Sequence, residues 1–292
     1  MSKTAMLPEG KVSYLDRGEG DPLLFVHGLL VNGQLWKGVA DRLEGSFRCI
    51  VPDWPMGSHR TALNPGADLS PPGIAGLIAA FMDALELDRV TLIGNDTGGA
   101  MSQIFTAAHP DRVERLILTN CDTLEHFPPF PFNGIPVLAR LPGGITVAVA
   151  PFRIGAIGRL TYGTLTARPL DPELVRSWLE PVIHDRHVRR DTRKLTAGIH
   201  KRHTIAAAEN LRSFEHPVRF IWGTADRFFK LAHAERLAAM LADAEIATVD
   251  DAATFSPLDR PEVVAELIAG FVAEGAAAPA GPSSPGGAPK VA

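Results

Sequence analysis

The stretch that most constrains the fold is VTLIGNDTGGAMSQI, residues 90–104. A β-branched and aliphatic run enters a turn that contains Gly94, Asp96 and Gly98, and a helix-like run follows at once. β-Branched residues favour a strand, whereas glycines permit the sharp turn that carries a strand directly into a helix. A strand joined in this way to a helix is the first half of a βαβ unit, so this stretch predicts an α/β fold.

Apolar runs of the same kind recur along the chain. The later runs are continuously apolar, which is typical of strands buried on both faces of a parallel sheet. A helix is expected over 74–85, where apolar residues recur at three- and four-residue spacing. Together these patterns predict a mostly parallel, doubly wound sheet. The expected strands cover residues 11–18, 23–28, 48–53, 90–95, 115–122, 218–226 and 244–250.

The alternation of strands and helices stops after residue 122. The next ninety or so residues contain proline-rich loops and amphipathic helical stretches, without a convincing strand. The α/β pattern then resumes, with helices expected at 231–242 and 261–273. Because inserted segments leave a domain at its surface loops, we expect one core interrupted by a helical cap. The expected parts are core residues 1–122, a helical cap at 123–213, core residues 214–274 and a disordered, Ala- and Pro-rich tail at 275–292.

The overall composition excludes several classes of partner. A net charge of -4 gives no electrostatic reason to expect nucleic acid or an anionic membrane. No apolar stretch is long enough to span a membrane, and the start lacks the features of a signal peptide. The two cysteines, Cys49 and Cys121, lie in apolar runs and are expected to be buried, reduced thiols. These features predict a cytoplasmic protein.

Three further segments share the order of a known family. FVHG (25–28) ends an early strand, WGTAD (222–226) ends a late one, and LDRPEVVAELIAGFV (258–272) forms the last helix. Together with the glycine-flanked Asp96 they resemble the α/β-hydrolase superfamily. Within it they are similar to the aspartate-nucleophile members, the epoxide hydrolases and haloalkane dehalogenases.

The resemblance implies a role for several residues. Asp96 would be the nucleophile, and the backbone N–H groups of Leu29 and Thr97 would form the oxyanion hole. Asp226 would be the acid that orients a catalytic histidine, and Asp122 resembles an alternative position for that acid. His27, in the His-Gly pair, would shape its turn rather than transfer protons.

An aspartate nucleophile favours one kind of chemistry. A carboxylate attacks a saturated carbon, such as that of an epoxide or an alkyl halide, and leaves an alkyl ester on the enzyme. A water molecule deprotonated by histidine would then hydrolyse that ester. The same attack on a carboxylic ester would give an anhydride, so Asp96 argues against an ordinary esterase.

The chain departs from the family pattern where the histidine is expected. The loop before LDRPE reads DDAATFSP, and Thr254 occupies the matching position. A threonine hydroxyl cannot act as a base at neutral pH. His126, where the chain leaves the core for the cap, and His59, after a strand, are the two candidates to replace it.

The sequence does not decide between the epoxide hydrolases and the haloalkane dehalogenases. Thr97 and Leu29 stand where haloalkane dehalogenases usually carry halide-binding side chains, and Tyr162 is the one tyrosine in the cap. Two histidine pairs, HDRH (184–187) and HKRH (200–203), lie among many basic residues, so a solvated helix face is favoured over a metal site. We expect no metal and no cofactor.

Two classes of function follow. The first is a hydrolase that acts on a small apolar electrophile through an alkyl-enzyme ester at Asp96. The second is a small-molecule-binding protein, or a lyase or isomerase, that kept the pocket without the histidine. Either function requires a small-molecule ligand, and the sequence does not indicate an oligomeric state.

Overall fold

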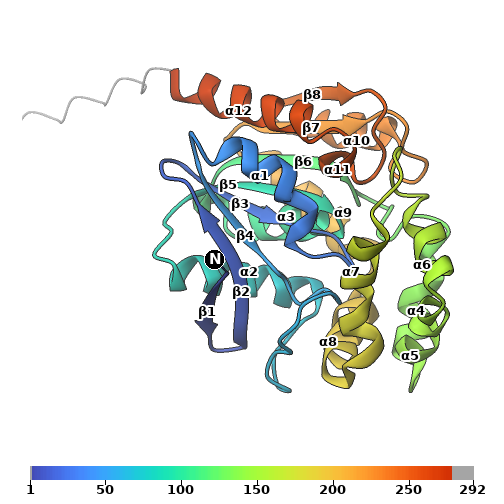
Figure 1. Cartoon of the computed structure of the whole chain (residues 1–292). Helices are drawn as coiled ribbons and strands as arrows, with labels where there is room; N and C mark the ends of the chain where they lie inside the picture. Colours follow the sequence, from blue (N-terminus) through green and yellow to red (C-terminus); the bar gives the residue numbers. More distant parts are fainter. Residues whose placement is uncertain (1, 278–292) are drawn as a thin grey trace, which may run out of the picture.

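The computed structural model describes residues 2–277, and its core is an eight-stranded sheet with the order β1-β2-β4-β3-β5-β6-β7-β8 (Figure 1). β1 and β2 pair antiparallel, as do β2 and β4, and all other neighbours are parallel. The predicted α/β class and the mostly parallel sheet are therefore confirmed. The strands are β1 (Lys3–Leu7), β2 (Gly10–Arg17), β3 (Pro22–Val26), β4 (Arg48–Pro52), β5 (Val90–Asp96), β6 (Val113–Cys121), β7 (Val218–Gly223) and β8 (Ala244–Val249).

Helices cover both faces of this sheet. Alternate residues of β3 show why: Leu24 and Val26 pack into one buried cluster, whereas Leu23 and Phe25 pack into another. The first cluster includes residues of α2, α3, α9 and α10, and the second includes residues of α1 and α12. The core helices are α1 (Lys37–Leu43), α2 (Pro71–Ala84), α3 (Thr97–Ala108), α9 (Lys201–Asn210), α10 (Leu231–Ala238), α11 (Ser256–Asp259) and α12 (Pro261–Ala277).

The segment between β6 and β7 supplies a second group of helices. This group contains five helices, α4 to α8, of which α8 packs against α4 and α7. The five lie beyond the carboxyl ends of the parallel strands (Figure 1). α9, also in this segment, packs instead against α3 beside the sheet. The five helices are α4 (Ile135–Arg140), α5 (Gly144–Val149), α6 (Gly155–Tyr162), α7 (Pro172–His184) and α8 (Arg186–Gly198).

Buried polar contacts join this insertion to the core. The indole N–H of Trp178, in α7, donates to the Asn32 side chain over 3.0 Å, and the Ser58 hydroxyl donates to the Trp178 carbonyl over 2.7 Å. Asn32 and Ser58 lie in the loops after β3 and β4. The insertion is thus held over the ends of these strands, where parallel α/β sheets bind their ligands.

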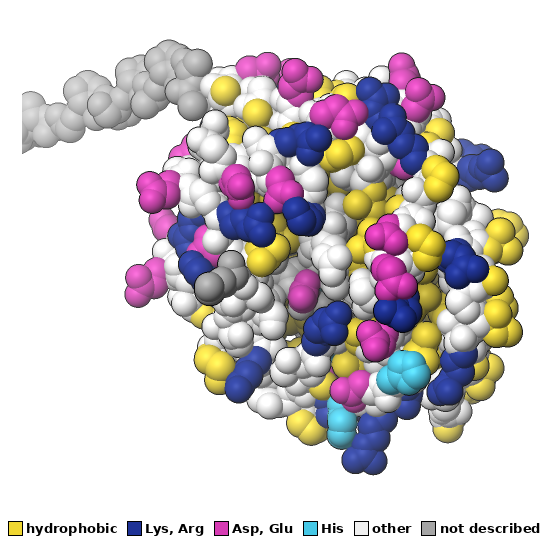
Figure 2. All heavy atoms as spheres, in the orientation of Figure 1, with side chains coloured by type: hydrophobic (Ala, Val, Ile, Leu, Met, Phe, Trp, Pro, Cys, Tyr) yellow, Lys and Arg dark blue, Asp and Glu magenta, His cyan; other side chains and the backbone are white. Residues whose placement is uncertain are grey.

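The structure also bears on the expectations for the cysteines, the surface charge and the tail. Cys49 and Cys121 are free and buried, as predicted. Within residues 2–277 no helix is both long and apolar enough to cross a membrane. Figure 2 shows basic and acidic side chains interspersed on the face that it draws. The predicted tail lies outside the described residues, apart from residues 275–277, which belong to α12.

Candidate active site

The turn after β5 holds Asp96 in a backbone conformation that few residues adopt. Its φ of 52° and ψ of -132° place it in a left-handed region where a side chain strains the backbone. A Cβ on Gly94 would lie 2.5 Å from the Ser102 hydroxyl of α3, and a Cβ on Gly98 would lie 2.3 Å from the His27 carbonyl oxygen. Glycine is therefore required on both sides of Asp96, because helix and neighbouring strand leave no room for a side chain.

A third glycine leaves the space that the Asp96 carboxylate occupies. A Cβ on Gly28 would lie 2.0 Å from the Asp96 Oδ2 atom. That oxygen accepts a hydrogen bond of 3.1 Å from the Leu29 N–H, and the Thr97 N–H also bonds to the carboxylate. Two backbone donors therefore converge on the acid, in the arrangement that stabilises an oxyanion.

Burial changes the acidity of this group. It raises the pKa of Asp96 from 3.8 to about 7, although the hydrogen bonds from Thr97 and Leu29 oppose the change, and the charge of Asp226 raises the pKa further. Asp96 is therefore poised to gain or lose its proton near neutral pH.

Asp96 opens onto a cavity of about 310 Å³ between the sheet edge and the insertion. Most of the lining is apolar and comes from α4, α5, α6 and the loops around them. A small apolar ligand would be enclosed here with few polar partners. The polar or titratable side chains in the lining are Asp96, Thr97, Asp122, Thr161, Tyr162, Thr192 and Thr196.

Asp122 faces the same cavity from the end of β6. It is 1% exposed, and its Oδ2 atom accepts a hydrogen bond of 3.4 Å from the Thr97 hydroxyl. Its Oδ1 atom is buried without a hydrogen-bond partner. Burial, and then the charge of Asp96, raise the pKa of Asp122 well above 3.8. Both effects favour the protonated form of Asp122.

Asp226 lies behind the cavity and does not line it. Its Oδ1 atom accepts from the N–H groups of Phe228 and Phe229, at 2.8 and 3.0 Å. Its Oδ2 atom accepts from the Asn120 amide at 2.9 Å. Burial nevertheless raises its pKa. These bonds hold the turn after β7 in place.

Thr254 is completely buried in the loop after β8. Its carbonyl accepts a hydrogen bond of 2.8 Å from the Asn95 amide. The hydroxyl is close enough to lower the pKa of Asp226, but it makes no hydrogen bond of normal geometry. Thr254 is not part of the cavity lining.

His27 holds the turn between β3 and Leu29, whose N–H binds the Asp96 carboxylate. Its Nε2 atom accepts the Trp54 N–H over 2.8 Å, and its Nδ1 atom lies 2.9 Å from the Gly28 carbonyl. Burial lowers its pKa to about 4, so it stays neutral and fixed.

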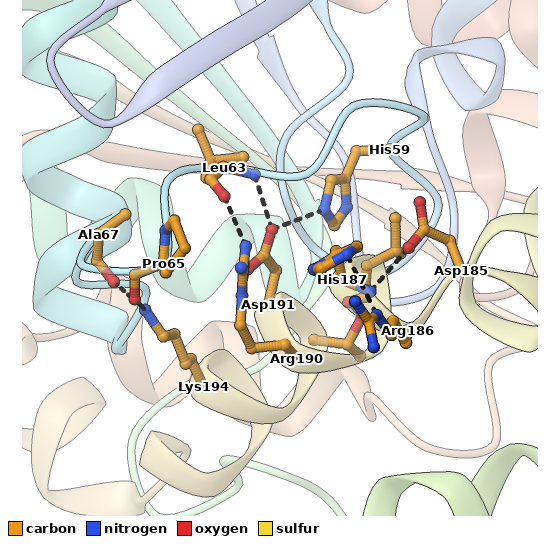
Figure 3. A network of polar contacts seen from close by, with 12 residues as sticks. His59, Leu63, Pro65, Ala67, Asp185, Arg186, His187, Arg190, Asp191 and Lys194 are labelled. Atoms are coloured by element: carbon orange, nitrogen blue, oxygen red, sulfur yellow. Dashed lines mark hydrogen bonds and ion pairs between the residues drawn. The ribbon is translucent and has the colours of Figure 1, made fainter.

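His59 is buried in a network between the loop after β4 and α8 (Figure 3). Its Nε2 atom lies 3.4 Å from Asp191, which also accepts from the Leu63 N–H and from Arg190. Burial alone would raise the pKa of Asp191, but these hydrogen bonds outweigh it and lower the pKa. Lys194 adds bonds to two carbonyls of the same loop. The network fastens α8 to the core, and His59 does not line the cavity.

His126 also lies outside the cavity lining. Its ring stacks on that of His233, with centroids 3.7 Å apart, and it lies 3.5 Å from Glu125. Its side chain is 32% exposed. The structure thus brings together Asp96, Leu29, Thr97 and Asp122, and it places both candidate histidines elsewhere.

Tyr162 does line the cavity, from α6. Its hydroxyl donates a hydrogen bond of 2.5 Å to the Leu30 carbonyl. Burial and the charge of Asp96 raise its pKa. The hydroxyl therefore stays protonated and is bound to the turn that carries Leu29. Sequence reasoning placed no such contact, because nothing in the α6 segment indicates it.

Comparison with known proteins identifies the family of this chain. The family described as alpha/beta hydrolase fold matches residues 21–261. An uncharacterised protein of Mycobacterium bovis is 26% identical over 266 residues, which cover 87% of this chain and 76% of that protein. Haloalkane dehalogenase 2 of Mycobacterium bovis is 32% identical over 111 residues, which cover 38% of each chain.

A third relative and a solved structure are also similar to this chain. The 2-hydroxy-6-oxo-2,4-heptadienoate hydrolase of Pseudomonas putida is 38% identical over 106 residues, which cover 35% of this chain and 38% of that enzyme. The crystal structure of an ancestral haloalkane dehalogenase matches with a TM-score of 0.80 at 20% identity, over 94% of this chain and all of that one. Fold and family define the class as that of a hydrolase. The chain belongs to the alpha/beta hydrolase fold family.

Among residues 2–277 no cluster of His, Cys, Asp or Glu has the composition of a metal site. The two histidine pairs of the insertion make local contacts instead: His200 caps α9 by accepting the Arg202 N–H, and His187 accepts from Arg186.

Proposed function

We propose that this protein hydrolyses a small apolar electrophile, and that the Asp96 carboxylate attacks a saturated carbon of the substrate. One observation carries the proposal: an acid that is strained by its turn and held by two backbone N–H groups faces an apolar cavity of about 310 Å³. The epoxides and haloalkanes are the substrate classes that suit such a carboxylate.

The reaction begins with bond formation between an Asp96 oxygen and the electrophilic carbon. The carbon–halogen or carbon–oxygen bond breaks, and the leaving group departs with the electron pair. Because Leu29 holds Oδ2, the other oxygen is the one that reaches the substrate. When water later attacks the ester carbonyl, negative charge develops on an oxygen that the Leu29 and Thr97 N–H groups stabilise.

The likeness to haloalkane dehalogenase 2 supports a carbon–halogen bond, although the matched region is only 38% of each chain. The apolar lining supports a small substrate without charge. The helical insertion then serves as a cap that excludes water from the attacking carboxylate.

The test is intact-mass spectrometry of the protein after mixing with a small bromoalkane or a terminal epoxide. We expect product to be released. Rapid acid quench should trap on Asp96 the mass of one alkyl group from the bromoalkane, or of the whole epoxide. Asp96→Ala should show neither. If Asp96→Ala turns over as fast as the parent, the nucleophile assignment is wrong.

A second candidate is a binding protein, or a lyase or isomerase, on the same scaffold. It is favoured by one observation: the described residues that line the cavity include no histidine. Such a protein would bind an apolar ligand without any mass change on Asp96. The same measurement therefore distinguishes the two candidates.

A further inference from the structure

We propose that Asp122 performs, beside Asp96, the acid and base steps for which relatives of this kind employ a histidine. This inference rests on the proposed function, because it assigns the proton transfers of the same reaction. It names Asp122 as a catalytic residue that faces the substrate, rather than as an acid that orients another side chain.

The sheet brings the two carboxyls together. β5 and β6 are parallel neighbours, and Asp96 is paired with Cys121, the residue just before Asp122. Both acids border the same cavity, and the Thr97 hydroxyl, next to Asp96 in sequence, reaches the Asp122 carboxyl over 3.4 Å.

The free oxygen of Asp122 is the second observation. Oδ1 is buried and has no hydrogen-bond partner, in a residue that is 1% exposed and borders the cavity. An unpaired polar atom of this kind is costly unless it has a use. A substrate oxygen or a water molecule in the cavity would be its partner.

The electrostatics assign the proton to one member of the pair. Two negative charges cannot both be accommodated cheaply in this apolar site. Burial and the Asp96 charge raise the pKa of Asp122 well above its usual value, whereas the N–H groups of Leu29 and Thr97 favour ionised Asp96. These effects favour the proton on Asp122 rather than on Asp96.

Within residues 2–277, none of the other titratable groups near this pair is placed to perform these proton transfers. Tyr162, from α6, has a raised pKa and donates to Leu30. Asp226, at the end of β7, is bound by Asn120 and two backbone N–H groups. Cys121, on β6, has a thiol whose pKa burial raises, so it stays protonated.

In the first step the pair acts as nucleophile and acid. An Asp96 oxygen forms a bond to an epoxide carbon, the ring carbon–oxygen bond breaks, and the ring oxygen takes the Asp122 proton. Asp96 is now a neutral ester and Asp122 is a carboxylate. A halide needs no proton when it leaves. With a haloalkane, Asp122 therefore releases its proton to solvent after ester formation has removed the neighbouring charge, and only then can it act as a base.

In the second step Asp122 acts as a base. It takes a proton from water as the water oxygen attacks the ester carbonyl of Asp96. When the tetrahedral intermediate collapses, the departing alkoxide takes a proton back from Asp122. Asp96 is released as the free acid, so the two residues again carry one proton between them.

The variant Asp122→Asn separates these steps, because its amide is neutral and cannot transfer the proton. With a bromoalkane we expect alkylation within about threefold of the parent rate, one equivalent of bromide per protein and a lasting adduct on Asp96. With a terminal epoxide we expect alkylation about 100-fold slower, which is the usual contribution of general acid catalysis. Adduct hydrolysis should also slow about 100-fold.

Three outcomes would overturn the inference. Parent rates in Asp122→Asn would leave Asp122 without a catalytic role while the proposed function stands. Equal slowing of both alkylations would mean that Asp122 only positions Asp96. A stable adduct in the parent protein would mean that the pair cannot act as a base. Absence of any adduct or product in the parent would instead refute the proposed function.

A measurement on the parent protein avoids the question of whether the variant folds. Alkylation by the bromoalkane should rise with pH through about 7, as Asp96 ionises, and then stay level. Alkylation by the epoxide should rise and then fall at higher pH, as Asp122 loses its proton. Identical profiles for the two substrates would contradict the inference.

Discussion

The turn after β5 and the loop after β8 both follow the carboxyl ends of parallel strands, but only the first is arranged around a group that faces the cavity. The first holds a strained, buried acid under two backbone donors, next to an open cavity. The second is closed: the Thr254 carbonyl is bound by Asn95, and the Ala253 N–H donates to Asp259 over 2.9 Å. No basic side chain projects from it.

This difference teaches that separate loops would build the two halves of the proposed reaction. The geometry for attack depends on β5, α3 and the turn after β3, whereas a water-activating base would come from another strand end. One half can therefore stay intact while the other is packed as ordinary structure. The following three variants test how independent these two regions are.

The largest effect is expected from Gly98→Ala. Its Cβ would lie 2.3 Å from the His27 carbonyl oxygen and 2.4 Å from that of Val26, and backbone atoms cannot move aside cheaply. We expect the free energy of unfolding to fall by about 4 kcal/mol or more, with loss of activity. Denaturant unfolding measures this change.

The matched control for that variant is Gly76→Ala in α2, where a Cβ meets nothing within 4 Å. It should raise stability by about 0.5–1 kcal/mol, because alanine favours a helix over glycine. Equal effects from both variants would show that the turn is not tightly packed.

An intermediate effect is expected from Asp96→Asn. The folded state raises the pKa of Asp96 from 3.8 to about 7, so it holds a proton that the unfolded chain has released. Stability is therefore lost as pH rises from about 4 to 7, by up to about 4 kcal/mol at 1.36 kcal/mol per pKa unit.

Asparagine cannot ionise, so Asp96→Asn should be more stable than the parent at pH 8 and nearly equal to it at pH 4. Thermal unfolding at the two pH values measures the difference. A variant that is less stable at pH 8 would show that the carboxylate is stabilising, in conflict with its strained and buried position.

The smallest effect is expected from Thr254→Val. The change removes a buried hydroxyl that has no hydrogen bond of normal geometry, and it keeps the shape of the side chain. Stability should change by no more than about 1 kcal/mol, and turnover by less than about twofold. A fall of tenfold or more would show that the hydroxyl participates and that the loop is not merely structural.

The sequence predicted the fold well because its signals are local. The glycines beside Asp96 and the apolar runs of the parallel strands depend on neighbouring residues alone. The first strand, Lys3–Leu7, was not predicted, because five residues with only Ala5 and Leu7 buried carry too weak a pattern.

The site was less accessible to prediction, because it depends on the direction of side chains. His59 follows a strand end, yet its loop turns toward Asp191 and α8. His126 stands near the insertion but stacks on His233. Asp122 was placed only as a reserve acid, and its sequence context, TNCD, does not reveal that it borders the cavity.

The pinned oxygen of Asp96 has a stereochemical consequence. Oδ2 is fixed against Gly28 and the Leu29 N–H, so in the proposed reaction the other oxygen would attack. Displacement at a saturated carbon would then invert its configuration. Hydrolysis of the proposed ester would cleave the bond at the carbonyl side and leave that carbon untouched. A chiral secondary substrate should therefore yield an alcohol of inverted handedness, whichever enantiomer the cavity admits.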